Sequence, residues 1–277
     1  MTSIVLGHGP HRIVGRVFPD VRALGKCLAA EILDGVRAAR AQGRRFLLGC
    51  PGGRSLQSTY RAMGEQAGCQ RADLSHVVLV MMDEYVNARA GGFAWCAPDA
   101  HFSCRRFARE QIQAVLNAGL EPGEQLPDGQ IWFPDPARPD AYEERIAAAG
   151  GIDLFLIASG ASDGHVAFNP PGSSGDTRTR IVRLADSTRC DNTVTFPEFA
   201  SAEDVPRHGV TVGLGTIRQS SRRVVLVMHG ADKCAAAARL AACGGFDPRW
   251  PASIIFLCRQ PAVYVDETVA AAVKGAS

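Results

Sequence analysis

The stretch FLLGCPGGRSLQSTYRAMGEQ, residues 46–66, contains the three elements on which the expected fold depends. A short apolar run of strand length comes first, a Pro-Gly-Gly turn follows it, and a helical pattern starts near Leu56. A strand, a glycine loop and a helix in this order are typical of proteins in which strands and helices alternate. The rest of the chain repeats this alternation.

Further apolar runs of strand length alternate with amphipathic helical patterns along the sequence. The first helix is expected from Pro19, with Asp20 as its N-cap and Gly43 as its stop. Strands are predicted at 77–82, 153–158, 224–228, 253–257 and 263–266, helices at 103–117, 142–149, 231–242 and 267–274, and loops at 87–101 and 119–139. Continuous apolar strands are buried on both faces, so the pattern predicts one α/β domain over residues 1–277, with a mostly parallel sheet between helices.

The composition is that of a globular protein and narrows the classes of function. The 277 residues are 46% hydrophobic, and 30 basic against 28 acidic side chains leave a net charge of +2. This small charge predicts no nucleic-acid partner, and no apolar run approaches the ~20 residues of a membrane span. The nine cysteines lie in apolar runs without C-x-x-C spacing, which predicts buried thiols and no zinc site. With no secretory signal recognised, we expect a cytoplasmic protein without a membrane partner.

Polar or glycine-rich clusters follow four of the predicted strands. They lie at 51–55, 83–84, 163–165 and 229–233. In a sheet of parallel strands, ligands bind beyond the carboxyl ends of the strands. The clusters therefore predict one ligand site at this edge of the sheet.

Two of the clusters could bind an anion. Gly52 and Gly53 allow the backbone to approach a ligand, and the free N–H groups of the following helix favour negative charge. Arg54 and Ser55 lie in the same loop, and a guanidinium can clamp a phosphate; a tight turn with a solvated arginine is the alternative. Lys233, at the start of a later helix, suits an anion there or is a solvated first-turn residue.

The other two clusters could transfer protons. Asp83 or Glu84 could be a general base after a buried strand, or a helix cap or turn residue, and strand alternation does not tell which of them faces the site. Asp163, two residues before His165, could orient the imidazole as a proton shuttle, or the histidine could be an ordinary loop residue. The motifs G-x-G-x-x-G and G-x-x-x-x-G-K-[ST] are absent from the sequence. We therefore expect neither a dinucleotide nor a nucleoside triphosphate as a ligand.

The order and wording of these segments resemble the glucosamine-6-phosphate deaminase family and, more distantly, the 6-phosphogluconolactonases. The resemblance rests on LGCPGGRSLQSTY (48–60), MMDEYV (81–86) and DGHVAFN (163–169), and extends over roughly residues 45–270. The FN pair after DGHVA favours the amino-sugar branch. The resemblance implies a three-layer α/β/α sandwich, a small-molecule sugar phosphate as partner, and no metal or organic cofactor.

The resemblance also implies a role for each matching residue. Asp83 would move a proton between C1 and C2 of the open-chain sugar. His165 would open the pyranose ring, with Asp163 supporting it. The glycine loop around residues 52–55 would bind the sugar phosphate through backbone amides, and Lys233 would bind the same phosphate.

The sequence departs from the family pattern at several of these positions. Pro170 stands where deaminases have a relay glutamate, and Asp176 and Glu84 are the carboxylates that could compensate. Val194 falls where the family has a phosphate-binding arginine. Arg54 replaces a loop glycine, and we expect it to supply the missing positive charge from the opposite side of the phosphate.

These features predict a cofactor-independent enzyme that isomerises and deaminates an amino hexose 6-phosphate. A non-deaminating isomerase, a lactonase and a non-catalytic phosphosugar-binding protein are the alternatives. A homo-oligomer is possible within the same interpretation. The segment 184–204 matches a mobile lid of the family, and Phe93 and Trp95 could shape the sugar pocket or belong to an ordinary loop.

Overall fold

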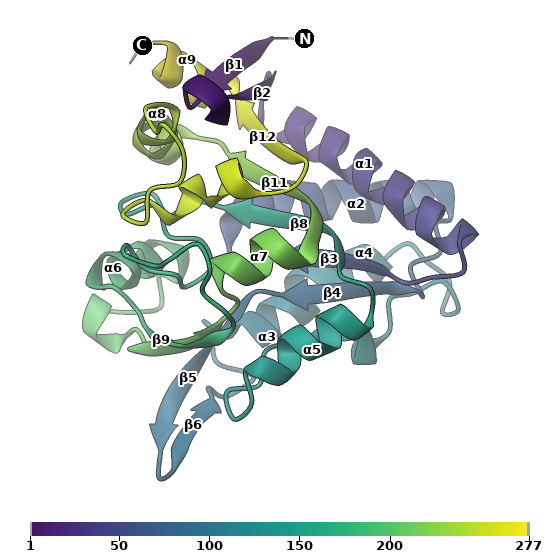
Figure 1. The fold of residues 1–277 in the computed structure, drawn as a ribbon. Helices are drawn as coiled ribbons and strands as arrows, with labels where there is room; N and C mark the ends of the chain where they lie inside the picture. Colours follow the sequence, from purple (N-terminus) through teal and green to yellow (C-terminus); the bar gives the residue numbers. More distant parts are fainter. Residues whose placement is uncertain (1, 276–277) are drawn as a thin grey trace.

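A computed structural model of the chain describes residues 2–275. Within them, the main sheet has eight strands, in the spatial order β1 (Ser3–Leu6), β2 (Ile13–Phe18), β12 (Pro261–Asp266), β11 (Ser221–Met228), β8 (Ile152–Ala158), β3 (Phe46–Cys50), β4 (Val77–Met81) and β7 (Ile131–Trp132). Within the part of this main sheet that the structure describes, only β1, which is antiparallel to β2, departs from the parallel direction (Figure 1). The sheet is therefore mostly parallel, as predicted.

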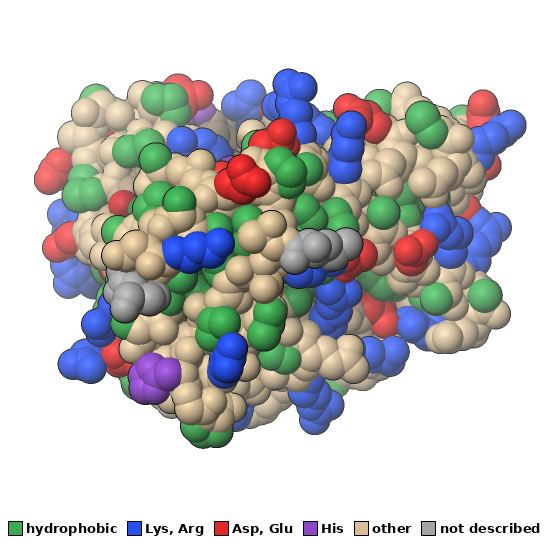
Figure 2. Space-filling view, turned by 90° about the horizontal axis from the view of Figure 1, so that it is seen from above, with side chains coloured by type: hydrophobic (Ala, Val, Ile, Leu, Met, Phe, Trp, Pro, Cys, Tyr) green, Lys and Arg blue, Asp and Glu red, His purple; other side chains and the backbone are tan. Residues whose placement is uncertain are grey.

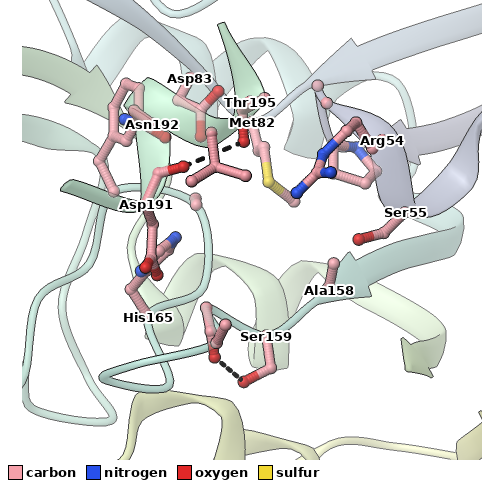
Figure 3. A pocket seen from close by; sticks show the side chains of 18 of the residues that line it. Arg54, Ser55, Met82, Asp83, Ala158, Ser159, His165, Asp191, Asn192 and Thr195 are labelled. Atoms are coloured by element: carbon pink, nitrogen blue, oxygen red, sulfur yellow. Dashed lines mark hydrogen bonds between the residues drawn. The ribbon is translucent and has the colours of Figure 1, made fainter. Parts of the chain in front are cut away.

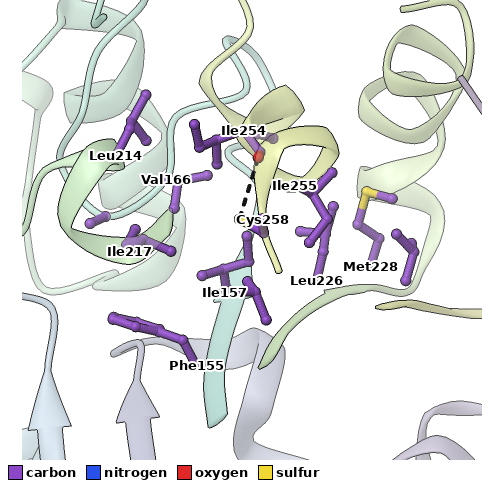
Figure 4. Close-up of a cluster of buried hydrophobic side chains, with 14 of the residues drawn as sticks. Phe155, Ile157, Val166, Leu214, Ile217, Leu226, Met228, Ile254, Ile255 and Cys258 are labelled. Carbon is purple, nitrogen blue, oxygen red and sulfur yellow. Dashed lines mark hydrogen bonds between the residues drawn. The ribbon is translucent and has the colours of Figure 1, made fainter. Parts of the chain in front are cut away.

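Helices cover both faces of this sheet (Figure 1). One face packs against α1 (Val21–Ala41), α2 (Gln57–Gln70) and the helical segment 104–117, and the other packs against α5 (Asp140–Ala148), α7 (Leu214–Ser220), α8 (Cys234–Ala241) and α9 (Glu267–Gly275). Leu154 and Leu156 of β8 belong to the first interface, whereas Phe155 and Ile157 belong to the second, which Figure 4 shows. Successive side chains of a strand point to opposite faces, so one apolar strand serves both layers. The α/β/α sandwich is confirmed.

The helix boundaries follow local signals. Asp20 caps α1 by accepting a hydrogen bond from the Ala23 N–H at 2.7 Å, and Gly43 follows the helix with φ +64°, both as predicted. The predicted helix at 103–117 is also present, as α3 (Cys104–Phe107), a π-helical turn over Ala108–Gln113 and α4 (Ala114–Asn117). Local signals thus fix where α1 begins and ends.

The segment 87–101 is not the plain loop that was predicted. It continues β5 (Asp83–Arg89) into a hairpin with β6 (Gly92–Trp95), and Gly91 and Gly92 turn the chain at φ +85° and +155°. These strands form an antiparallel sheet with β10 (His208–Thr211) and β9 (Arg180–Arg183). The prediction was wrong because β5 is polar beyond Val86 and the hairpin therefore lacks the apolar run on which the strand predictions relied.

The strand predicted at 253–257 is also wrong. The run Pro251–Leu257 forms a 3-10 helix, and the hydroxyl of Ser253 donates to the Trp250 carbonyl at 2.7 Å. Ile254 and Ile255 are fully buried in the core that Figure 4 shows. Burial alone does not distinguish a short strand from a short helix, since both can bury a brief apolar run.

The charged side chains and the cysteines of the structure can be compared with the composition-based predictions. On the face seen in Figure 2, basic and acidic side chains are interspersed, so this face carries no extended basic patch. Five of the nine free cysteines are buried, but Cys69 and Cys190 are exposed, so the prediction of uniformly buried thiols was wrong. Among residues 2–275, none of the helices combines the length and apolarity needed to cross a bilayer.

Candidate active site

A cavity of about 400 Å³ opens at the carboxyl ends of β3, β8 and β11. Three of the strand-end loops line it, and Asp83 reaches it from the start of β5. Helix α6 (Asp186–Thr195), within the segment 184–204, forms another wall. The predicted residues that line this cavity are Gly52, Gly53, Arg54, Ser55, Asp83, His165 and Lys233, and Asp163 contacts it only through His165.

The glycine loop forms one side of the cavity. Gly53 has φ +85°, a conformation that glycine adopts without strain, and the chain then enters a 3-10 turn over Arg54–Leu56 that leads into α2. In Figure 3 the guanidinium of Arg54 points into the cavity. No hydrogen bond or ion pair to the Arg54 side chain is formed by residues 2–275. An unpaired guanidinium beside a helix N-terminus favours an anion at this end.

Lys233 adds a second cation to the same cavity. Its Nζ donates to the Ser159 carbonyl at 3.0 Å and lies 3.9 Å from a carboxylate oxygen of Asp232. Burial lowers the pKa of Lys233, and the charge of Arg54 acts in the same direction, whereas Asp232 and Asp191 oppose the shift. Arg54 and Lys233 are therefore close enough to repel each other, and an anion bound by both would relieve that repulsion.

His229 is a cavity residue to which the sequence analysis gave no role. It follows β11, and its Nε2 lies 3.0 Å from the Ser55 carbonyl. This contact ties the loop after β11, which carries Lys233, to the glycine loop. The two cation-bearing loops are thus held together before any ligand binds.

Asp83 is a buried carboxylate on the cavity wall. Only 6% of its surface is exposed, and burial raises its pKa to about 7, with the charge of Glu84 acting in the same direction. The Cys104 thiol donates to Asp83 Oδ1 at 3.4 Å and, like the charge of His165, opposes the rise. A carboxyl with a pKa near neutrality can both accept and return a proton at physiological pH.

Glu84 points away from the cavity and has a structural role. One of its oxygens accepts from the backbone N–H groups of Tyr85 and Cys104, and the other accepts from Arg105 N–H and the Ser103 hydroxyl. It thereby caps the helix that begins at residue 104. The structure identifies Asp83 as the cavity-facing carboxylate of the pair, and the suggestion that Glu84 compensates for Pro170 is wrong.

Asp163 and His165 form a hydrogen-bonded pair. Asp163 Oδ1 lies 2.7 Å from His165 Nδ1 and accepts from the His165 backbone N–H at 3.0 Å. Its Oδ2 accepts from the hydroxyls of Ser187 and Thr188 on α6. Although burial opposes it, these bonds and the nearby imidazole hold the pKa of Asp163 well below its usual range. An ionised Asp163 only accepts, so Nδ1 donates and Nε2 is the ring nitrogen left for a ligand.

Asp176, the other suggested substitute for the family glutamate, does not line the cavity. Its carboxylate pairs with Arg218 at 2.5 Å on the surface. The carboxylate that does reach the His165 end of the cavity is Asp191 on α6, which sequence reasoning missed.

Among the described residues, one group has the spacing of metal ligands. It consists of Asp163, His165 and Asp191, whose possible ligand atoms all lie within 4.8 Å of one another. Both oxygens of Asp163 already accept two hydrogen bonds each, which favours a proton-transfer pair over an open set of metal ligands.

Comparisons with known proteins show which family the chain resembles. The model of glucosamine-6-phosphate isomerases/6-phosphogluconolactonase matches residues 19–265. A glucosamine-6-phosphate deaminase of Pseudarthrobacter chlorophenolicus is 37% identical over 91% of this chain and 90% of its own length. Another from Porphyromonas gingivalis is 35% identical over 92% of each protein.

Solved structures show the same fold. A monomeric glucosamine-6-phosphate deaminase superposes with a TM-score of 0.75 at 24% identity, covering 93% of this chain and 98% of its own. The 6-phosphogluconolactonase of Trypanosoma brucei gives 0.63 at 19% identity, covering 92% and 97%. The fold and the family match define a class of α/β enzymes. The chain belongs to the glucosamine-6-phosphate isomerase/6-phosphogluconolactonase family, as the sequence motifs predicted.

Proposed function

We propose that this protein is a cofactor-independent enzyme that converts an amino hexose 6-phosphate into a ketose phosphate and releases ammonia. One observation carries the proposal: a carboxyl with a pKa of about 7, a His–Asp pair and an anion-binding end share one cavity. Relatives that match along most of the chain are named glucosamine-6-phosphate deaminases. A receptor would need the anion-binding end alone, so the additional proton-transfer groups favour catalysis.

The residue types support a complete reaction. The phosphate is bound at Arg54, Lys233 and the loop N–H groups. His165 Nε2 accepts the proton of the C1 hydroxyl and passes a proton to the ring oxygen O5 as the C1–O5 bond breaks, which leaves an aldehyde at C1. Asp83 then removes the C2 proton while the ammonium group of the substrate gives a proton to the C1 oxygen, which produces an enolamine. Asp83 returns its proton to C1, and the C2–N bond becomes a protonated imine. Water adds to the resulting C2 imine, the C–N bond breaks, and ammonia leaves with the ketose as the other product. Each positioned proton transfer contributes typically ~10²–10⁴-fold.

A pH profile follows from the position of Asp83. The carboxylate must be ionised to remove the C2 proton, so kcat/KM is expected to fall below a pH of about 7, far above the ~3.9 of an unperturbed aspartate. The Cys104→Ala substitution removes a donor that lowers this pKa, so the acidic limb should move to higher pH. Both profiles can be measured with a coupled ketose phosphate assay, and a limb that stays near pH 4 in either protein contradicts the assignment.

Arg54 supplies the second phosphate contact in this proposal. Arg54→Ala is expected to raise KM by about 10-fold or more with a small effect on kcat, because charge-assisted hydrogen bonds of this kind contribute most to binding. The matched control is Arg61→Ala, which removes an exposed arginine of α2 outside the cavity lining. If KM for every sugar phosphate is unchanged in Arg54→Ala, the guanidinium does not bind the phosphate.

A substrate panel tests the reaction itself. Aminated and non-aminated hexose phosphates are incubated with the enzyme, products are identified by NMR, and ammonia is measured by a coupled assay. Ammonia and ketose phosphate in equal amounts support the proposal. Ketose without ammonia indicates a non-deaminating isomerase, hydrolysis of a phosphogluconolactone indicates a lactonase, and binding without any product indicates a phosphosugar-binding protein.

We also propose a cytoplasmic location for this enzyme. All nine cysteines are free thiols, two of them exposed, which suits a reducing compartment. Fractionation of cells that express a tagged chain tests this directly.

A further inference from the structure

Asp191 carries a carboxylate into the cavity that no step of the proposed reaction uses. It lies on α6, and its Oδ2 accepts a hydrogen bond from the Ser162 hydroxyl at 3.0 Å. Oδ1 has no hydrogen-bond or ion-pair partner within residues 2–275, and the residue lines the cavity wall. One oxygen therefore fixes the side chain while the other remains available to a ligand.

The cavity holds Arg54 on one side and two carboxylates, Asp83 and Asp191, on the other, and Lys233 is close enough to both Arg54 and Asp191 for their charges to act on its pKa. Arg54 and Ser55 lie on one side in Figure 3, whereas Asp83, Asp191 and His165 lie on the other. The donor atoms of Asp191 and His165 are within 4.8 Å of each other, so Asp191 stands beside the ring-opening histidine of the proposal. A molecule with an anion at one end and a cation near the other matches this arrangement.

We propose that Asp191 binds the ammonium group of the substrate and so selects aminated over hydroxylated sugar phosphates. The inference deepens the proposed function and rests on it for the orientation of the phosphate at Arg54. With the phosphate anchored there, the C1–C2 end of the sugar faces Asp83 and Asp191, and the amino group is carried by C2. A carboxylate attracts an ammonium group much more strongly than a hydroxyl, because the ammonium hydrogen bond is charge-assisted.

The attachment of α6 to the His165 loop holds the Asp191 carboxylate in a position where it can bind the ammonium group. Ser187 and Thr188, one turn earlier on α6, donate to Asp163, and Asp191 accepts from Ser162 in the same strand-end loop. Helix α6 is thus attached at two places, residues 187–188 and Asp191, to the loop that carries His165. This double attachment gives the Asp191 carboxylate a defined place relative to the reacting end of the sugar.

The test measures binding without turnover. Calorimetric titrations use two open-chain analogues that cannot isomerise, 2-amino-2-deoxyglucitol 6-phosphate and glucitol 6-phosphate. The wild-type protein is expected to bind the amino analogue about 10-fold or more tightly than the hydroxyl analogue. Asp191→Asn, which keeps the size and an acceptor for Ser162, should weaken the amino analogue by about 10–100-fold and leave the hydroxyl analogue within about two-fold.

Ser162→Ala is the matched control. It removes the hydrogen bond to Asp191 but keeps the carboxylate, so most of the preference for the amino analogue should remain. Equal weakening of both analogues by Asp191→Asn means a structural role for α6, and the absence of a preference in the wild-type protein also overturns the proposal. If the preference depends on Asp191 but no ammonia is released in the substrate panel, the inference stands and the deaminase function fails.

Discussion

The Asp83→Asn variant is expected to lose turnover by about 10²–10⁴-fold while sugar-phosphate binding is retained. The asparagine would keep the size of the side chain and would still lie beside Cys104, but it cannot accept a proton from carbon. The phosphate contacts proposed for Arg54 and Lys233 are on other loops, so Kd should change little. Single-turnover kinetics and calorimetric titration measure the two effects separately, and unchanged turnover would refute the assignment of Asp83 as the base.

The stability of the same variant provides an independent check. Burial raises the pKa of Asp83 from 3.8 to about 7, so folding favours the protonated form. The stability that this group contributes is fully present below the unfolded-state pKa near 4 and is lost as the pH rises through 7. Asparagine never ionises, so Asp83→Asn should melt at a higher temperature than the wild-type protein at pH 8 and show little difference near pH 4. Equal melting temperatures at both pH values would mean that Asp83 is not perturbed by burial.

Much of the fold and of the cavity lining could be predicted because each depends on neighbouring residues. A capping aspartate, a glycine turn and an apolar run are local signals, and they correctly placed α1, β3 and α2. In sheets of parallel strands, ligand-binding loops follow the carboxyl ends of the strands. This rule predicted that residues 51–55, 163–165 and 229–233 lie at one edge of the sheet. The cavity is lined by residues from all three loops.

The remaining features depend on contacts between distant segments. The sequence could not tell Asp83 from Glu84, since the difference arises when the helix at residue 104 packs its N–H groups against Glu84. Asp191 lies in a helix with no glycine motif or strand end to mark it. Its position becomes meaningful only because α6 folds back over the loop that carries His165. A carboxylate in the segment 184–204, which matches a lid of the family, was the available signal.

Gly160 shows how such a packing requirement can be tested. A Cβ atom at this position would lie 2.2 Å from His165 Nδ1 and 2.7 Å from Asp163 Oδ1, so no side chain fits while the two residues remain hydrogen-bonded. In the Gly160→Ala variant the imidazole must turn away from Asp163. The expected loss in kcat is about 10²–10⁴-fold, that of a displaced acid–base group, with little change in phosphate affinity.

The NMR resonance of the imidazole proton between His165 and Asp163 shows whether the hydrogen bond between them is lost in this variant. In the wild-type protein the imidazole N–H that donates to Asp163 should give a downfield proton resonance, and in Gly160→Ala that resonance should disappear while the melting temperature stays close to that of the wild type. Gly129→Ala is the control, because a Cβ there meets no atom within 4 Å, and it should alter neither measurement. If Gly160→Ala keeps both the resonance and full turnover, the His165–Asp163 pair tolerates a side chain at position 160, and the close packing around it does not control its alignment.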